Sequence, residues 1–372
     1  MNSRILGRGL CCSDCAVRIA GRGISIQQRT FSSSSIRQKH GAVPAFTEVS
    51  SPELQDLLTK LRERLFLPAH LAKQQRDLIF KPKHEKSLNV EPVTAIIAGE
   101  EFRLKHISMT KDVPARMKSL QRATKLMKEK RDWDNLPNLL RGLKTVGFRL
   151  GQFPPEALVR RAGSAGRQDV VLECLRRADE TGLTLTDPSV VVQVFFWIQQ
   201  KAMASLWDAE ETKKALHWAE MVKEMMEDPK HQAPESRRSV AEPHEINGIL
   251  LELAAVRAVK HQGGKDGEGK VKKYALELLA SPRDFESPTA ASKGQNYWLS
   301  TNTPGVHGMK LAQTVLGPTS ELSIRLKGRC EKLEPLLSAT RDELFEHSKL
   351  HGKEDKLSGM RIFEELLGPN AS

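Results

Sequence analysis

Residues 134–150, which read DNLPNLLRGLKTVGFRL, match residues 169–185, which read DVVLECLRRADETGLTL, at an offset of 35 positions. The aligned pairs are Asp134 with Asp169, Leu140 with Leu175, Arg141 with Arg176, and Gly147 with Gly182. A fixed period of this length is typical of stacked helical hairpins, in which each unit buries its apolar face against its neighbours. The offset therefore predicts a mainly α-helical solenoid of stacked hairpins, which is a binding scaffold rather than an enzyme.

The clearest single unit lies at residues 153–187. A first helix opens with PEALV, a turn follows in AGRQD, a second helix contains LECLRR, and ETGL closes it. This unit resembles a pentatricopeptide repeat, the helical hairpin common in organellar RNA-binding proteins. Residues 118–152 resemble the repeat less closely, and the pattern is degenerate beyond residue 188.

The resemblance also names two positions per repeat that read a base. One lies near the start of the first helix and the other at the end of the repeat. In this chain they are Ala157 with Asp187, and Arg122 with Gln152. Neither pair resembles a base-reading pair of that family, so we do not expect this chain to read an RNA sequence.

Residues 1–38 have the composition of a mitochondrial transit peptide. They contain six arginines, no lysine and one acidic residue, Asp14, and they include RTFSSSS at 29–35. A leader rich in Arg and Ser and poor in acids is typical of mitochondrial import. Arg18 and Arg22 interrupt the apolar core that a secretory signal would need. We therefore expect a location in the mitochondrial matrix; the alternative is a basic tail without a targeting role.

Composition favours a protein with an anionic partner. The formal net charge is +12, and without the leader it is about +7. Outside the leader only Cys174 and Cys330 remain, so no disulfide framework is implied, and the half zinc motif at Cys12 and Cys15 falls within the leader. The longest apolar run, residues 190–198, is shorter than the ~20 residues of a membrane span. We expect no membrane span.

Three regions follow the leader. Residues 39–110 form an N-terminal arm, in which Ser51 caps a leucine-rich helix and a short β-hairpin turns at Gly99. Residues 111–230 form the pentatricopeptide-like helical-repeat domain. Residues 231–372 form a C-terminal helical region, where Ser, Pro, Asn and Gly predict an irregular loop over 281–306 and Pro335 is expected to begin a new helix.

A set of cations in the repeat region forms the candidate RNA-binding site. Its members are Arg116, Lys118, Arg122 and Lys125 on a predicted helix over 115–130, and Arg160, Arg161, Arg167, Arg176 and Arg177 in the clearest hairpin. Contacts of such side chains with phosphates give affinity that falls with salt and carry no sequence information. The alternative is that these arginines are solvated and paired with nearby carboxylates.

Motifs for other chemistry are incomplete. The stretch GKDGEGK at 264–270 spells a phosphate loop, but Val271 stands where Ser or Thr would hold magnesium, and no strand precedes it. His347 and His351 have the spacing of a zinc helix without an evident third ligand. We expect no catalytic site, no metal, no cofactor and no small-molecule substrate.

The whole profile is similar to the lineage-specific proteins that cover mitochondrial ribosomes, and the leader and build have a fungal character. The resemblance implies a structural, non-catalytic component of the mitochondrial ribosome that contacts rRNA and ribosomal proteins. The large subunit is slightly favoured. One alternative is a pentatricopeptide-type factor for the stability, processing or translation of a mitochondrial mRNA. The other is a mitochondrial assembly factor or protein adaptor.

Overall fold

The computed structural model describes residues 30–31, 41–232, 244–281, 292–350 and 357–368. It divides the chain into two compact units. One unit contains Met1–Arg37 and Ala72–His106, and the other contains Gln38–Leu71 and Ile107–Ser372. Apart from Thr30 and Phe31, the predicted leader lies outside the described residues. The predicted N-terminal arm is divided between the two units.

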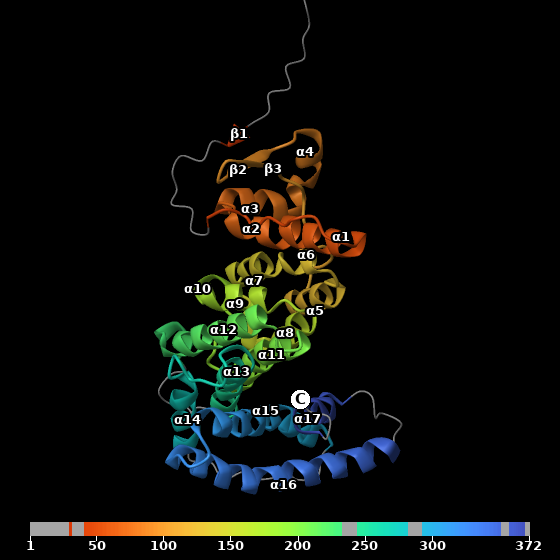
Figure 1. Ribbon diagram of the computed structural model, residues 1–372. Coiled ribbons are helices and arrows are strands. Elements are labelled where there is room, and N and C mark those ends of the chain that lie inside the picture. Colours follow the sequence, from red (N-terminus) through yellow and green to blue (C-terminus); the bar gives the residue numbers. More distant parts are fainter. Residues whose placement is uncertain (1–29, 32–40, 233–243, 282–291, 351–356, 369–372) are drawn as a thin grey trace, which may run out of the picture. The chain divides into compact units, whose positions relative to one another are not determined.

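The first unit combines short helices with a small sheet (Figure 1). Its elements are β1 (Thr30–Phe31), α3 (Lys73–Phe80), the 3-10 helix η2 (Pro82–His84), α4 (Glu85–Val90), β2 (Thr94–Ile97) and β3 (Glu100–Arg103). Strand β2 pairs antiparallel with β3 and parallel with β1. Ala98 and Gly99, which join β2 to β3, both have positive φ, as a tight hairpin turn requires. The predicted hairpin is confirmed.

The second unit begins with a segment that is fastened to the helical repeats. It leads into α1 (Pro52–Leu61), the π-helix η1 (Arg62–Phe66) and α2 (Leu67–His70). The Ser51 side chain caps α1 by accepting a hydrogen bond from the Leu54 amide. Upstream, Asn135 accepts a hydrogen bond from the Thr47 amide at 2.8 Å and donates one to the Thr47 carbonyl at 3.2 Å. One side chain thus satisfies both backbone groups of Thr47.

Asp132 makes a second fastening of the same segment. It is fully buried and accepts hydrogen bonds from the amide and the hydroxyl of Ser50, each at 2.7 Å. The amides of Lys128 and Glu129 also donate to it, at 3.0 Å. Burial by itself would raise the pKa of Asp132, but these hydrogen bonds outweigh it and lower the pKa below the usual 3.8.

The helical repeats follow. Their elements are α5 (Arg116–Leu126), α6 (Lys130–Trp133), α7 (Leu136–Thr145), the 3-10 helix η3 (Leu150–Gln152), α8 (Pro155–Ser164), α9 (Gln168–Arg176), α10 (Ala178–Thr181), α11 (Pro188–Ala204), α12 (Ala209–Glu227) and the 3-10 helix η4 (Pro229–His231). Gly147 and Gly182 each lie just after a helix, with φ values of +78° and +76°. Glycine adopts such positive φ values without a steric penalty. Leu140 and Leu175 are both buried. The helical-repeat fold predicted from the offset is confirmed.

Two glycines allow helices to approach closely in this region. Gly163 in α8 lies against the indole of Trp197 in α11, and Gly142 in α7 lies against the ring of Phe66 in η1. A β-carbon built on Gly163 would lie 2.2 Å from Cγ of Trp197, and one on Gly142 would lie 2.5 Å from Cε2 of Phe66. Such distances exclude any larger residue without movement of the ring.

The helical array continues beyond the repeats. Its last elements are α13 (His244–His261), α14 (Lys270–Ala280), α15 (Ser292–Leu316), α16 (Glu321–Leu350) and α17 (Ser358–Leu367). Helix α13 contacts α11, α12, α14 and α15, and α15 also contacts α16 and α17 (Figure 1). Pro335 lies inside α16 instead of starting a separate helix, so that expectation was wrong.

The predicted irregular loop over 281–306 was also wrong for its second half. Residues 282–291 lie outside the described residues, but residues 292–306 belong to α15. The polar side chains of this stretch bond to carbonyls of the preceding turn, as Thr303 does to Leu299 at 2.7 Å and Asn302 does to Trp298 at 2.9 Å. Gly305 meanwhile permits close packing on Gly248 of α13. Tertiary packing therefore overrides a composition that favours loops.

A buried polar network joins four of these helices. Glu252 of α13 is inaccessible to solvent, and it accepts hydrogen bonds from Gln199 of α11 at 3.0 Å and pairs with His307 of α15 at 2.7 Å. Gln200 donates to Gln199, and Arg361 of α17 donates to Gln200. Burial raises the pKa of Glu252 above 4.5 despite these bonds.

No helix in the described part of the chain is long and apolar enough to cross a membrane.

Candidate nucleic-acid interface

Helices α5 and α8 carry most of the predicted cations that are exposed. The two helices are joined by Arg161, whose Nη1 donates to the hydroxyl of Thr124 at 2.7 Å. Thr124 is buried, and its hydroxyl in turn donates to the carbonyl of Leu120. Arg161 is half-buried by this contact, whereas Arg160 beside it is exposed. This bond is the contact by which Arg161 of α8 reaches α5. No signal in the sequence marks Thr124 as its partner.

The exposed side of α5 carries further positive charge. Arg116, Lys118 and Lys125 are exposed, and none of them forms an ion pair with any other described residue. Arg122 also lies on this side, but it forms an ion pair with Glu53 of α1. We call Arg116, Lys118, Lys125, Arg160 and Arg161 the α5–α8 basic surface. Its members have charge available for an external anion.

Arg167 occupies a different environment. Its side chain is only 9% exposed and forms ion pairs with Asp134 at 2.6 Å and Asp169 at 2.9 Å. It also donates to the carbonyl of Lys130. The hydrogen bonds to Asp169 and then Asp134 raise the pKa of Arg167 against the opposing effect of burial. Asp134 and Asp169 are equivalent positions of the 35-residue offset. Arg167 therefore links two consecutive helical repeats.

Arg176, the last residue of α9, and Arg177, which follows it, are paired with glutamates on the surface. Arg176 bonds to Glu173 at 2.8 Å, and Arg177 bonds to Glu180 at 2.6 Å. Glu180 also lies 4.0 Å from Arg141 of the preceding unit. The charges of this cluster are largely balanced inside the chain. The predicted cations thus separate into the α5–α8 basic surface, the buried Arg167, and three arginines that are compensated on the surface, namely Arg122, Arg176 and Arg177.

The positions that read bases in the resembled family have other tasks here. Asp187 caps α11 by accepting a hydrogen bond from the Ser189 amide at 2.9 Å. Arg122 is paired with Glu53. Ala157 has no polar group to offer, and the side chain of Gln152 is not described. The geometry therefore agrees with contact to an RNA backbone rather than recognition of bases.

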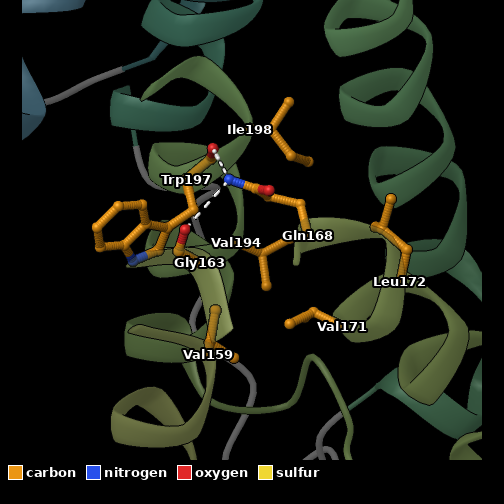
Figure 2. Close-up of a pocket in the computed structure, with 8 residues that line it drawn as sticks. All are labelled: Val159, Gly163, Gln168, Val171, Leu172, Val194, Trp197 and Ile198. Atoms are coloured by element: carbon orange, nitrogen blue, oxygen red, sulfur yellow. Dashed lines mark hydrogen bonds between the residues drawn. The ribbon is translucent and has the colours of Figure 1, made fainter. Parts of the chain in front are cut away.

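The tryptophans of the repeat region do not form a stacking surface. Trp133 and Trp207 are buried, and Trp197 and Trp218 are half-buried. Trp197 instead packs on Gly163 and accepts a hydrogen bond through its carbonyl from Gln168 at 3.0 Å (Figure 2). Large aromatic side chains in such places fill the core between helices.

The cavity beside Trp197 is too small for a ligand. It measures about 10 Å³ and has an apolar lining apart from one amide side chain (Figure 2). It is lined by Val159, Gly163, Gln168, Val171, Leu172, Val194, Trp197 and Ile198. A cavity of this size holds at most one water molecule, which would need more polar partners than it offers. The cavity is a packing defect between α8, α9 and α11.

Metal-binding groups do not gather in the described residues. No cluster of three or more His, Cys, Asp or Glu is found among them. His347 is exposed on α16, and His351 lies outside the described residues. Cys174 is buried, and burial raises the pKa of its thiol well above the usual 9.0, so it is an unreactive core residue.

These features define a class of protein: an α-helical repeat scaffold with an exposed basic surface. Comparison with known proteins identifies the family. A family model described as "Mitochondrial ribosomal protein mS27" matches residues 29–363. The chain is also 35% identical, over 271 residues, to the "Small ribosomal subunit protein mS27" of Neurospora crassa, and the match covers 68% of each chain. The chain belongs to the mS27 family of mitochondrial ribosomal proteins.

The family membership confirms the prediction of a mitochondrial ribosomal protein of fungal character, with a structural role in a ribonucleoprotein. It agrees with the expectation of a non-catalytic protein and of ribosomal partners. The expected subunit is corrected: the relative is named as a protein of the small subunit, not of the large subunit that the sequence analysis slightly favours. Nothing in the repeat pattern distinguishes the two subunits.

Proposed function

We propose that this chain is a structural component of the small subunit of the mitochondrial ribosome in the matrix. Its α5–α8 basic surface contacts the phosphates of ribosomal RNA, and its other helical faces contact neighbouring ribosomal proteins. The observation that supports the RNA contact is which of the cations already have a carboxylate partner within the chain. Lys118 and Lys125 are exposed without a carboxylate partner, whereas Arg167 and Arg177 are compensated within the chain.

Physical reasoning supports the choice of surface. An arginine that is already paired and desolvated gains little from a phosphate, because the existing ion pair must first be broken. A solvated lysine or arginine releases counterions from the RNA when it neutralises a phosphate. Of the nine predicted cations, the α5–α8 basic surface therefore supplies the RNA contacts. Arg167, Arg176 and Arg177 stabilise the scaffold.

Sedimentation of ribosomes tests this function. The tagged chain should migrate with the small subunit in a high-salt sucrose gradient, at an abundance equal to that of other proteins of that subunit. Recovery only at the top of the gradient, or at a small fraction of ribosome abundance, would contradict it. A protein specific for one transcript would instead be scarce and would deplete a single mitochondrial product.

A matched pair of variants tests the surface. We expect Lys118→Gln with Lys125→Gln and Arg160→Gln to lower retention on the subunit as salt increases. Arg176→Gln with Arg177→Gln and Lys213→Gln removes the same charge elsewhere and should leave retention unchanged. Equal loss in both variants would mean that net charge, rather than this surface, holds the chain on the ribosome.

A further inference from the structure

The first compact unit carries a concentration of positive charge that lies outside the α5–α8 basic surface. Its helical part, residues 73–90, contains Lys73, Arg76, Lys81, Lys83 and Lys86 but only two acidic residues, Asp77 and Glu85. The hairpin part, residues 91–105, has an excess of acids, with Glu91, Glu100 and Glu101 against Arg103 and Lys105. The positive charge of this unit is therefore concentrated in its helical part, while the hairpin part is close to neutral.

The five cations of the helical part are all exposed. Helix α3, η2 and α4 contact one another, and they bury Ile79 and Leu88, so their polar faces must point outward. Lys81 bonds to Asp77 at 2.8 Å. This bond, and the nearby charges of Lys73 and Arg76, lower the pKa of Asp77. Three cations thus surround a single carboxylate, which leaves uncompensated positive charge on this face.

We propose that this face, formed by Lys73, Arg76, Lys81, Lys83 and Lys86 and here called the α3–α4 basic face, is a second RNA-binding surface that clamps the backbone of a double-helical RNA. The choice of RNA as the polyanion rests on the proposed function in the ribosome. The clamp itself is carried by the geometry of the first unit and does not depend on the α5–α8 basic surface.

The double helix is favoured over single-stranded RNA by the absence of a stacking platform. Residues 72–106 contain no Trp or Tyr. Phe80 is half-buried and Phe102 is buried, so neither presents a ring to a base. Proteins that hold single strands use exposed aromatic side chains, whereas double-stranded RNA is held mainly through its backbone and shape. Lys73 begins α3 and Lys81 follows its last residue, so the helical rise separates them by about 12 Å and they reach separate phosphates.

Binding of the full-length chain to a blunt RNA duplex of ~16 base pairs, measured over a series of salt concentrations, tests the clamp. The test variant carries Lys73→Gln, Arg76→Gln and Lys83→Gln, which leave the Lys81–Asp77 pair in place. The control carries Lys213→Gln, Lys265→Gln and Lys272→Gln, exposed lysines that lie outside both basic surfaces. Both variants remove the same charge, and an unchanged circular dichroism spectrum confirms that each is folded.

The test variant should reduce the slope of log K against log salt by about 2 to 3, and should weaken duplex binding about tenfold or more at low salt. The control should behave as the wild type, and Lys73→Arg with Lys83→Arg should retain binding. Equal slopes for the test variant and the wild type would overturn the clamp. A larger loss for a single-stranded oligouridine than for the duplex would overturn the choice of a double helix.

Two further outcomes separate the clamp from the proposed function. If the test variant binds duplex RNA normally but is lost from the small subunit, the face binds an acidic protein and the RNA clamp is wrong. If the wild type never sediments with the small subunit, yet duplex binding depends on the α3–α4 basic face, the clamp stands and the proposed function is wrong.

Discussion

Replacement of Gly163 by Ala tests whether α8 and α11 pack as closely as the structure describes. The new methyl group would lie 2.2 Å from Cγ and 2.4 Å from Cδ2 of Trp197. An ordinary contact between carbon atoms is about 3.5 to 4.0 Å, so the indole must withdraw by about 1.3 Å or more. The ring of Trp197 also lies edge-on to the ring of Phe196, with 5.2 Å between the ring centroids, which restricts its movement.

The net effect is the difference between two opposing terms. Alanine is favoured over glycine inside a helix by about 1 kcal/mol. Overpacking of a rigid ring against a helix backbone costs about 1 to 3 kcal/mol, and more where the ring cannot move. The required displacement exceeds 1 Å, and the nearest atom, Cγ, lies at the base of the indole rather than at the end of a flexible side chain. We therefore expect Gly163→Ala to lower the free energy of unfolding by about 2 kcal/mol.

Gly328→Ala is the matched control. Gly328 also lies inside a helix, α16, but a β-carbon there would meet nothing within 4 Å. We expect this variant to be more stable than the wild type by about 0.5 to 1 kcal/mol. Urea unfolding followed by circular dichroism and tryptophan fluorescence measures both effects. The sign of the change should therefore differ between two substitutions that are chemically identical.

A double-mutant cycle identifies the cause. Trp197→Leu removes the ring, so Gly163→Ala should cost much less in that background than in the wild type. The reasoning is refuted if Gly163→Ala is as stable as the wild type, or if its cost is the same with and without the Trp197 ring. Either result would mean that the two helices do not approach as closely as described.

Three other predictions concern the buried polar groups and the cavity. The pKa of Glu252 is raised, so its contribution to stability is complete below pH 4.5 and is lost as pH rises through the folded value. Glu252→Gln should therefore lose less stability than the wild type as pH rises above 4.5, and parallel pH profiles of the two proteins would contradict this. The pKa of Asp132 is lowered, so its contribution to stability is present above pH 3.8 and is lost as pH falls through the lower folded value. Asp132→Ala should lower the free energy of unfolding in urea by about 3 kcal/mol at neutral pH. Adding Ser50→Ala should cost less in that variant than in the wild type, and full additivity of the two losses would show that the residues do not interact. Val171→Ile adds a methylene next to the cavity of about 10 Å³ and should raise the unfolding free energy by up to about 1 kcal/mol, whereas a loss would show that the space is already filled.

Local signals predicted the helical elements well. The Ser51 cap and the leucines after it define α1, and buried leucines at helical spacing define α7 and α9. Gly147 and Gly182 mark helix ends because their φ values favour glycine. Pro335 and the 292–306 stretch were misread, since helix α15 and helix α16 are stabilised by neighbours that the local sequence does not show.

The candidate surface could be predicted only in outline. Arg160 and Arg167 are the same residue type in one hairpin, yet one is exposed and the other is paired with two carboxylates. The α3–α4 basic face was missed, although the run KPKHEK at 81–86 is a visible signal.

The sequence by itself determined the repeat period, the helix ends and the basic character of this protein, because each depends on residues close together in the chain. Only the tertiary structure decided which cations are left without a carboxylate partner inside the chain. Arg167 pairs with Asp134 of the preceding repeat, and Glu252 of one helix pairs with His307 of another. Pairings of this kind depend on distances between side chains far apart in the sequence, and these distances are fixed by packing of the helices rather than by any local pattern.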